Sequence, residues 1–276
     1  GAREDFLQQF PQADAYGNLD AVSPDMRVDL VSVCSPTAEH LNGVREALKW
    51  GARVILCEKP LAPSIAEAEV LIAEAERRNC TLVANYSRRW TAMLEKLSEL
   101  TSEGGPLGKV TGAVLHYNGG LNHNGTHWID LLQALFGPVD QAFALDSFPT
   151  EGDSAESILM TWKSGVKAYL LSVHAQGYSI GEGDFWGKGG MVRFRDGGAT
   201  VTFQQVVDSA WPGYTSLSPE TVLCQNGLQG HILGAVEEVV RLARIGGVSK
   251  SPALSGLQAM KVVAMARQHR IFNLNQ

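Results

Sequence analysis

The fold is predicted by one stretch, Arg53-Val54-Ile55-Leu56-Cys57-Glu58-Lys59-Pro60. Residues 53–57 form a short, mostly apolar run, which predicts a buried strand, and a lysine and a proline follow almost directly. Similar apolar runs at 28–34 and 81–85 lie on either side, separated from the first run by helical patterns such as 38–50. This β-α-β-α-β alternation predicts a parallel sheet with right-handed crossovers.

Polar residues follow each of these predicted strands. They are Ser35-Pro36-Thr37, Glu58-Lys59-Pro60 and Tyr86-Ser87-Arg88-Arg89. The carboxyl ends of parallel strands share one edge, and ligands of open α/β sheets bind outside that edge. The sequence therefore predicts that Lys59 faces a ligand-binding crevice.

Composition excludes several classes of protein. The chain has 276 residues, 45% hydrophobic and 19% charged, which is enough for a large core and two domains. Its net charge of -6 and the lack of a basic stripe argue against a nucleic-acid partner. No apolar run approaches the roughly 20 residues of a membrane-spanning helix, and the first residues lack the pattern of a signal peptide. We therefore expect a cytoplasmic protein with no membrane partner.

The four cysteines, Cys34, Cys57, Cys80 and Cys224, lie singly along the chain. Zinc sites use closely paired ligands, and that spacing is absent here. The pattern predicts buried free thiols.

The pattern changes in the second part of the chain. Beyond about residue 107, period-two segments broken by glycines predict a mostly antiparallel open sheet. We expect a parallel α/β unit over residues 1–90 and an α+β domain over residues 91–276. The expected strands are 109–117, 141–148, 157–162, 167–174, 191–194 and 199–203, and the expected helices are 125–136, 228–244 and 255–269. Hairpin turns are predicted at Lys163-Ser164-Gly165 and Asp196-Gly197-Gly198.

A second group of chemically active residues surrounds His127. His123, His127 and Asp130 follow one another at spacings of four and three, which could hold a divalent metal on one helix face. No Cys or Glu joins them at ligand spacing, and Gly125 indicates that the helix begins after Asn124, so we predict no metal site. The residues alone leave His127 open as a reactive histidine or as a histidine that only fills an interface.

Five motifs in order resemble the glucose-fructose oxidoreductase, inositol dehydrogenase and MocA (Gfo/Idh/MocA) family. They are residues 28–36 with His40, residues 57–61, Arg88-Arg89-Trp90, Gly119-Gly120 with residues 125–130, and residues 186–191. The resemblance implies a Rossmann domain that binds NAD or NADP, followed by an α/β domain with an open antiparallel sheet. It also implies a sugar or polyol substrate and a homo-oligomer, dimer or tetramer, built through that sheet.

The resemblance also implies roles for single residues. Lys59 matches the lysine that contacts the substrate hydroxyl and the cofactor, and His127 matches the histidine that exchanges a proton with the substrate. Histidine titrates near neutrality, whereas a lysine ammonium can stabilise a developing alkoxide, so we predict His127 as the proton shuttle and Lys59 as the electrostatic clamp. The remaining substrate residues would be His123, Asn124, Asp130 and Arg89. The cofactor residues would be Ser35, Pro36, Thr37, His40, Glu58, Lys59, Pro60 and Arg88.

The chain departs from the family pattern in two ways. His123 stands where the family usually has an aspartate, four positions before the catalytic histidine. No Gly-x-Gly-x-x-Gly fingerprint precedes residue 28, so an incomplete Rossmann-type sheet, without its first β-α-β unit and its phosphate-binding loop, is expected. Gly187-Lys188-Gly189-Gly190 lies between strand-like segments and predicts a tight hairpin instead of a phosphate loop.

Three functions agree with these patterns. The first is an NAD(P)-dependent oxidoreductase acting on a sugar, cyclitol or polyol. The second is a non-catalytic binding or assembly protein that lacks affinity for the cofactor. The third is a lyase or glycosidase that uses a tightly held NAD for transient oxidation.

Overall fold

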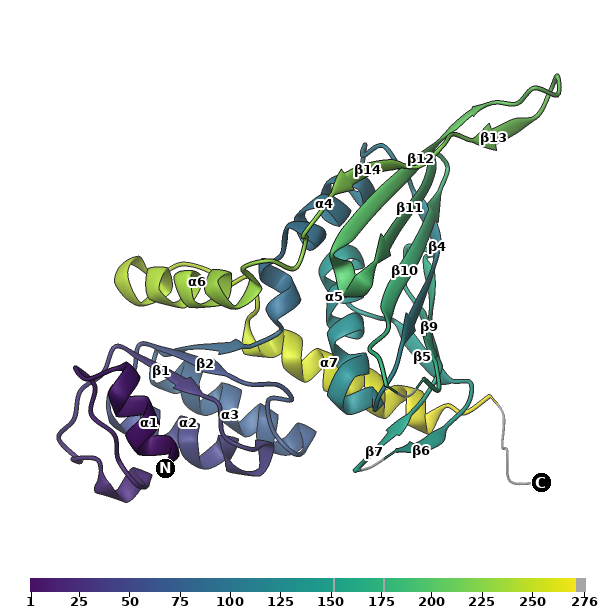
Figure 1. Cartoon of the computed structure of the whole chain (residues 1–276). Helices are drawn as coiled ribbons and strands as arrows, with labels where there is room; N and C mark the ends of the chain where they lie inside the picture. The colour runs from purple at the N-terminus through teal and green to yellow at the C-terminus, as the bar shows by residue number, and fades with distance from the viewer. Residues whose placement is uncertain (151, 176, 272–276) are drawn as a thin grey trace.

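The computed structural model describes residues 1–150, 152–175 and 177–271 and contains two main sheets (Figure 1). The smaller sheet has the order β1-β2-β3. Its strands β1 (Leu30–Val33), β2 (Val54–Cys57) and β3 (Thr81–Ala84) are parallel. A parallel sheet followed by a mostly antiparallel one confirms the predicted fold class.

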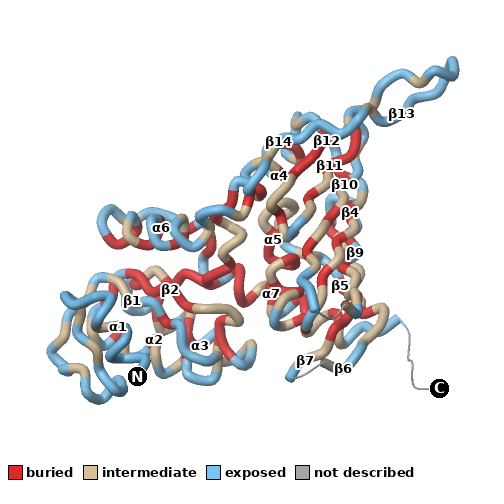
Figure 2. The backbone as a smooth tube through the Cα atoms, viewed as in Figure 1, coloured by how far each residue is buried: buried red, intermediate tan, exposed pale blue. Residues whose placement is uncertain are grey.

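Both faces of the parallel sheet are covered, which explains why β2 is apolar at every position. Ile55 and Cys57 pack beneath α2 (His40–Lys49) and α3 (Ile65–Arg77). Val54 and Leu56 point to the other face and pack against α6 (His231–Ile245), which comes from near the end of the chain. In Figure 2 β2 is buried, and the helices on either side of the sheet carry both buried and exposed residues.

The larger sheet has the order β13-β12-β11-β10-β4-β9-β8-β5, with β14 also paired to β12. Within it, β4 and β9 pair in parallel and the other neighbours are antiparallel. A separate hairpin joins β6 to β7. The strands are β4 (Val110–Tyr117), β5 (Gln141–Ala144), β6 (Phe148–Thr150), β7 (Asp153–Ala155), β8 (Ile158–Thr161), β9 (Lys167–Ser172), β10 (Gly181–Gly187), β11 (Gly190–Arg195), β12 (Thr200–Asp208), β13 (Thr215–Leu217) and β14 (Thr221–Cys224).

The expected strand set lacked β7, β10, β13 and β14, and it included only Phe148 of β6. Glycine is depleted in strands, and β10 contains Gly181 and Gly183, so local composition argued against a strand there. A Cβ on Gly181 would lie 2.4 Å from the ring of Trp128, and one on Gly183 would lie 2.3 Å from the ring of Phe194. Glycine stands in this strand because two aromatic rings pack directly on its backbone.

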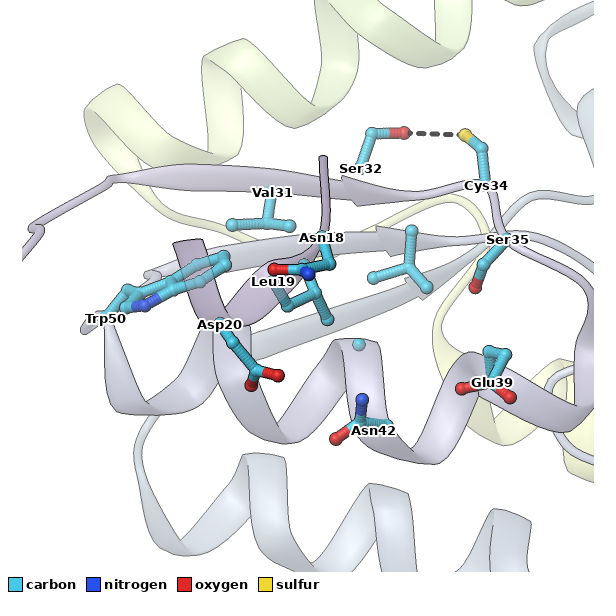
Figure 3. A pocket seen from close by; sticks show the side chains of 12 residues that line it. Asn18, Leu19, Asp20, Val31, Ser32, Cys34, Ser35, Glu39, Asn42 and Trp50 are labelled. Carbon is cyan, nitrogen blue, oxygen red and sulfur yellow. Dashed lines mark hydrogen bonds between the residues drawn. The ribbon is translucent and has the colours of Figure 1, made fainter. Parts of the chain in front are cut away.

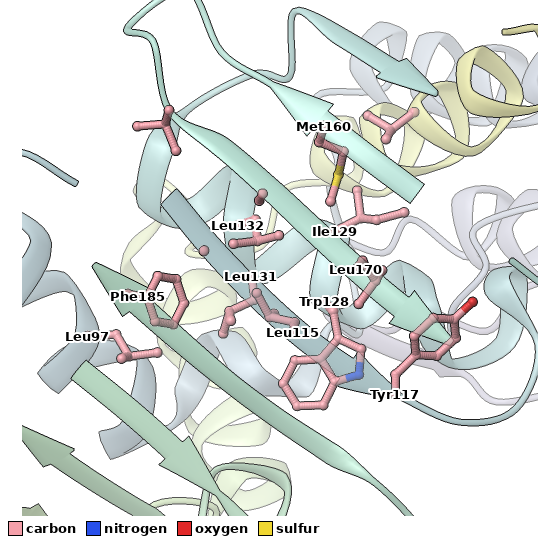
Figure 4. Close-up of a cluster of buried hydrophobic side chains, with 14 of the residues drawn as sticks. Leu97, Leu115, Tyr117, Trp128, Ile129, Leu131, Leu132, Met160, Leu170 and Phe185 are labelled. Atoms are coloured by element: carbon pink, nitrogen blue, oxygen red, sulfur yellow. The ribbon is translucent and has the colours of Figure 1, made fainter. Parts of the chain in front are cut away.

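Three helices cover one face of the larger sheet. They are α4 (Ala92–Thr101), α5 (Thr126–Phe136) and α7 (Ala253–Gln268). The core between helices and sheet includes Trp128 and Phe185 (Figure 4), and Phe194 also belongs to it. The rings of Trp128 and Phe194 stack with centroids 5.3 Å apart. Leu257 of α7 belongs to the core of the parallel sheet while Val262 belongs to the larger core, so α7 packs against both sheets.

The remaining helical segments are short. They are α1 (Ala2–Gln9), the 3-10 turns η1 (Leu19–Ala21), η2 (Thr37–Glu39), η3 (Ser87–Trp90) and η5 (Asp196–Gly198), and the π-helical turn η4 (Leu121–Gly125). The predicted hairpins are confirmed: positive φ angles occur at Gly165 between β8 and β9 and from Asp196 to Gly198 between β11 and β12. The segment from Gly187 to Gly190 is the predicted tight hairpin between β10 and β11.

Two further observations concern the thiols and the membrane. Cys57 and Cys80 are buried and free as predicted, but Cys34 is exposed at the end of β1 and Cys224 is half-buried, so the prediction of burial is wrong for these two. Among the described residues, no helix is both long enough and apolar enough to cross a membrane.

Candidate active site

Lys59 extends from the end of β2 toward the loop that leads into α5. Its Nζ donates a hydrogen bond to the carbonyl oxygen of His123, 2.8 Å away, across 64 positions of sequence. The peptide bond between Lys59 and Pro60 is cis. The amine after the parallel strand therefore lies beside η4, the turn that carries His123 and leads into α5 with His127.

Glu58 connects the loops after β2 and β3. Its Oε1 accepts a hydrogen bond from Asn85 Nδ2 at 2.6 Å, and its Oε2 accepts one from the backbone N–H of Lys59 at 3.2 Å. These bonds hold the backbone of Lys59 in place. Asn85 was absent from the predicted site, although its position directly after β3 would have indicated it.

Asp153 of β7 holds the turn that carries His123. Its carboxylate accepts from the backbone N–H of His123 at 3.0 Å and from Asn122 Nδ2 at 2.9 Å. Arg267 of α7 lies 3.5 Å from the same carboxylate. The sequence offered no signal for Asp153, because no motif links it to the turn, which lies about 30 positions earlier in the chain.

Gly120 is expected to be intolerant of a methyl group. A Cβ there would lie 2.0 Å from Asp153 Oδ2, so Gly120→Ala should push away the carboxylate that holds the turn and destabilise the chain by about 1–3 kcal/mol. Urea denaturation checks this. Gly112→Ala is the matched control, since its nearest neighbour is Lys167 O at 3.7 Å. Equal stability of the two variants would contradict the close contact.

His127 lies in the first turn of α5 and is partly buried. Its ring packs edge-on against Tyr86 with centroids 5.5 Å apart. Within the described part of the chain, its Nδ1 is buried without a hydrogen-bond partner. Burial lowers the pKa of His127 well below 6.5, and the positive charges of Arg88 and Lys59 lower it further. The imidazole is therefore neutral at neutral pH and can accept a proton.

The lowered pKa of His127 predicts acid sensitivity of the fold. The unfolded chain takes up the proton near pH 6.5 and the folded chain does so only at lower pH, so stability is lost as pH falls below 6.5. One such group contributes a slope of at most about 1.4 kcal/mol per pH unit. We expect His127→Gln to flatten the fall in unfolding free energy between about pH 6.5 and about pH 5 in urea titrations. Parallel curves for variant and wild type would contradict this expectation.

Arg89 and Asp130 form a buried ion pair that joins η3 to α5. Arg89 Nε donates to Asp130 Oδ2 and Nη2 donates to Oδ1, both at 2.8 Å, while Nη1 donates to the carbonyl of Lys250 at 3.0 Å. Burial raises the pKa of Asp130, and the bonds from Arg89 oppose that shift. Asp130 is fully buried. Substrate contact by these two residues stays a prediction.

Arg88 is placed differently from Arg89. Its guanidinium lies over the ring of Trp128, with Cζ 4.1 Å from the ring centroid. Its Nε is buried without a partner among the described residues. Burial lowers the pKa of Arg88 to about 10. Lys59 also has a lowered pKa, first because of burial and then because of Arg88, with Glu58 acting in the opposite direction.

The predicted residues after β1 lie beside a separate cavity. It has a volume of about 520 Å³ and lies between β1 and α2 (Figure 3). Ser35 lines it, together with Glu39, Asn42 and Trp50. His40 is buried, and its ring nitrogens lie 3.0 Å from the carbonyl of Ser35 and 3.3 Å from that of Leu61, so it joins the loops after β1 and β2.

The predicted site is thus partly brought together. The structure brings together Lys59, Glu58, His123 and His127. Asn124 is instead bound to the backbone, because its Nδ2 donates a hydrogen bond to the carbonyl of Asn118 at 2.7 Å. Pro36 is exposed and Thr37 begins η2, both on the β1 side. No group of three or more His, Cys, Asp or Glu within the described ranges could hold a metal ion.

Comparison with known proteins finds relatives of part of this chain. The Gfo/Idh/MocA sequence model, described as an oxidoreductase family with an NAD-binding Rossmann fold, matches residues 2–86. An oxidoreductase of Schizosaccharomyces pombe is 31% identical over 147 residues, which are 46% of this chain and 39% of that protein. A myo-inositol 2-dehydrogenase of Thermotoga maritima is 32% identical over 111 residues, 39% of this chain and 33% of that enzyme. The matched stretches thus span less than half of each relative.

Solved structures share the fold over nearly the whole chain. An oxidoreductase of Agrobacterium radiobacter in complex with NAD+, L-tartaric acid and magnesium has a TM-score of 0.77 at 16% identity, covering 96% of this chain and 84% of that one. A UDP-N-acetylglucosamine 3-dehydrogenase of Acidithiobacillus ferrooxidans has a TM-score of 0.74 at 17% identity, covering 98% and 86%. Residues 2–86 thus match the Gfo/Idh/MocA oxidoreductase family, and these solved structures share the fold of nearly the whole chain.

Proposed function

We propose that the chain is an NAD(P)-dependent oxidoreductase that acts on a hydroxyl group of a sugar, cyclitol or polyol. One observation carries the proposal. Lys59, at the carboxyl end of a parallel strand, donates to the turn that leads into the His127 helix, so an ammonium and a neutral imidazole flank one point. The similarity to a myo-inositol 2-dehydrogenase and a UDP-N-acetylglucosamine 3-dehydrogenase supports a hydroxyl-bearing ring as substrate.

The residues around this point fit a polar ligand, such as the substrate or the nicotinamide end of the cofactor. Asn85 Oδ1, Arg88 Nε and His127 Nδ1 are buried without partners among the described residues. Buried polar atoms are normally hydrogen-bonded, so these atoms suit a ligand with donors and acceptors of its own. We propose that Ser35, Glu58 and Lys59 lie along the cofactor, which supplies a hydride acceptor when it is bound.

The protein side chains would handle the proton and the charge. As an alcohol is oxidised, its hydroxyl proton must leave, and the neutral imidazole of His127 is the acceptor that we propose. Oxygen becomes more negative as that proton leaves, and the ammonium of Lys59 stabilises the developing charge. Burial of both side chains strengthens these interactions, because less water screens them.

The test is a pair of measurements on the purified chain. Calorimetric titration with NAD+ and NADP+ measures cofactor binding, and absorbance of the reduced nicotinamide measures turnover with myo-inositol, D-glucose and D-glucitol. Binding of either dinucleotide and turnover of at least one substrate are expected. If neither dinucleotide binds, the oxidoreductase proposal fails and the non-catalytic alternative replaces it. The oxidoreductases among the relatives give the lyase alternative no support.

We further propose that a second copy of this chain packs against the open face of the larger sheet. Tyr169 of β9 and Trp186 of β10 are 38% and 37% exposed, although their neighbours Leu170 and Phe185 are buried beneath the helices. Sedimentation velocity should show a dimer or tetramer, and Tyr169→Lys should shift it toward the monomer. A monomeric wild-type chain would rule this interface out.

A further inference from the structure

Within the described part of the chain, some of the positively charged side chains around Lys59 and His127 have an acidic partner and others do not. Arg89 is neutralised by Asp130 at 2.8 Å, and Lys59 lies next to Glu58, whose charge acts on it. Arg267 approaches both Glu156 and Asp153. Arg88 has no acidic partner among the described residues. The site therefore has one guanidinium without a counter-charge.

Arg88 is held in place without its charge being neutralised. η3, which carries it, packs against α5, and its Cζ lies 4.1 Å from the centroid of Trp128, the residue that follows His127. The aromatic face stabilises the cation, and Trp128 is itself fixed by stacking on Phe194. Because the ring occupies one side of the guanidinium plane, the N–H edge stays available for hydrogen bonds. The buried Nε has no partner among the described residues.

Keeping such a cation poorly hydrated and unpaired is unfavourable in the free protein. An anionic group that binds there recovers the lost interactions, and a planar guanidinium fork matches a carboxylate with two parallel hydrogen bonds. Arg88 is also close enough to Lys59 and His127 to contribute to the lowered pKa of both. A ligand that reaches Arg88 would thus also reach the proposed reaction centre.

We propose that Arg88 binds the carboxylate of an acidic polyol or sugar acid whose hydroxyl lies at Lys59 and His127. This inference rests on the proposed function, because the oxidoreductase chemistry places the hydroxyl at Lys59 and His127. It narrows the substrate from any polyol to one that carries a carboxylate. It also moves Arg88 from the cofactor, where the family resemblance put it, to the substrate.

The experiment compares two probes that differ at a single carbon. D-gluconate ends in a carboxylate and D-glucitol ends in an alcohol, and the remaining carbons are the same. Calorimetric titration of the full chain, with excess NAD+ present, should show gluconate binding at least about tenfold more tightly at low salt. Equal affinity for the two probes would overturn the proposal.

Variants then assign the preference to Arg88. Arg88→Gln keeps a polar side chain without the charge and should remove the preference for gluconate, while its circular dichroism and its melting curve show that it folds. Arg78→Gln is the matched control, since Arg78 is an exposed arginine beyond the end of α3. Retention of the preference by Arg88→Gln, or its loss in Arg78→Gln, would overturn the assignment.

A third probe separates substrate from cofactor. Nicotinamide mononucleotide carries the cofactor's phosphate, and the same titrations without NAD+ show whether it competes with gluconate. If nicotinamide mononucleotide binds without competing with gluconate, the proposal is supported. If the two compete and the competition depends on Arg88, then Arg88 binds the cofactor phosphate and the proposal is wrong. These readouts need no turnover, so a chain that prefers gluconate but reduces no NAD+ contradicts only the proposed function. A chain that oxidises neutral polyols without a preference for gluconate contradicts only the inference.

Discussion

His127→Ala is expected to lower kcat for polyol oxidation by about 10²- to 10⁴-fold, because it removes the group that we propose as the acceptor of the hydroxyl proton. The neutral imidazole is already poised for this role by burial and by the nearby charges of Arg88 and Lys59. Lys59→Ala should cause a loss of about 10²- to 10³-fold, since the developing charge on oxygen loses its ammonium. Absorbance assays of nicotinamide reduction measure both effects.

The controls separate catalysis from folding. His116→Ala removes a histidine from β4, in the larger sheet, and should leave kcat near the wild-type value. Lys59→Ala also removes the hydrogen bond to the His123 carbonyl, so the melting temperature of each variant must be measured alongside its kcat. Near-normal kcat in folded His127→Ala and Lys59→Ala would refute the assigned roles.

Asp130→Ala should destabilise the chain by about 3–5 kcal/mol, the usual cost of leaving one partner of a buried ion pair alone. Asp130 is fully buried and accepts two hydrogen bonds of 2.8 Å from Arg89, so its removal leaves a guanidinium without a counter-charge between η3 and α5. Urea denaturation, with the slope checked for two-state behaviour, measures the loss.

Two further variants show that burial causes the effect. Glu74→Ala breaks a pair of the same geometry, in which Arg45 donates at 2.9 and 2.8 Å, but that pair is exposed and should contribute little. The double replacement Arg89→Met with Asp130→Leu removes both charges and should be more stable than Asp130→Ala. If Asp130→Ala and Glu74→Ala had equal effects, the buried pair would not be holding η3 on α5.

The sequence predicted the parallel sheet because its signals are local. An apolar run of four or five residues is visible directly in the sequence, and so is the polar loop that follows it. The hairpin turns were also predictable, since Asp196-Gly197-Gly198 adopts positive φ angles that few other residues tolerate. Strand β10 escaped prediction because its glycines reflect tertiary packing, with Trp128 of α5 on Gly181 and Phe194 of β11 on Gly183.

The residues of the candidate site also fall into two groups, those predicted from the sequence and those found only in the structure. Lys59 and His127 were predicted as a reactive pair from the family resemblance and from the chemistry of their side chains. Asn85 and Asp153, which hold Glu58 and the turn with His123, were found only in the structure, because their partners lie 27 to 31 positions away. The sequence alone could not show that Arg89 is paired with Asp130 while Arg88 Nε is left without a partner in the described part of the chain, because the two residues are adjacent and have the same side chain.

The sequence by itself thus determined the order of the elements, the residues that border the parallel edge and the family to which they are similar. The physical reason is that strand pattern, turn chemistry and motif spacing are properties of neighbouring residues. Only the tertiary structure decided which charges are paired, which polar atoms lack partners and where Lys59 reaches. These depend on contacts across the fold, where burial lowers the pKa of His127 and leaves the Nε of Arg88 without a hydrogen-bond partner among the described residues.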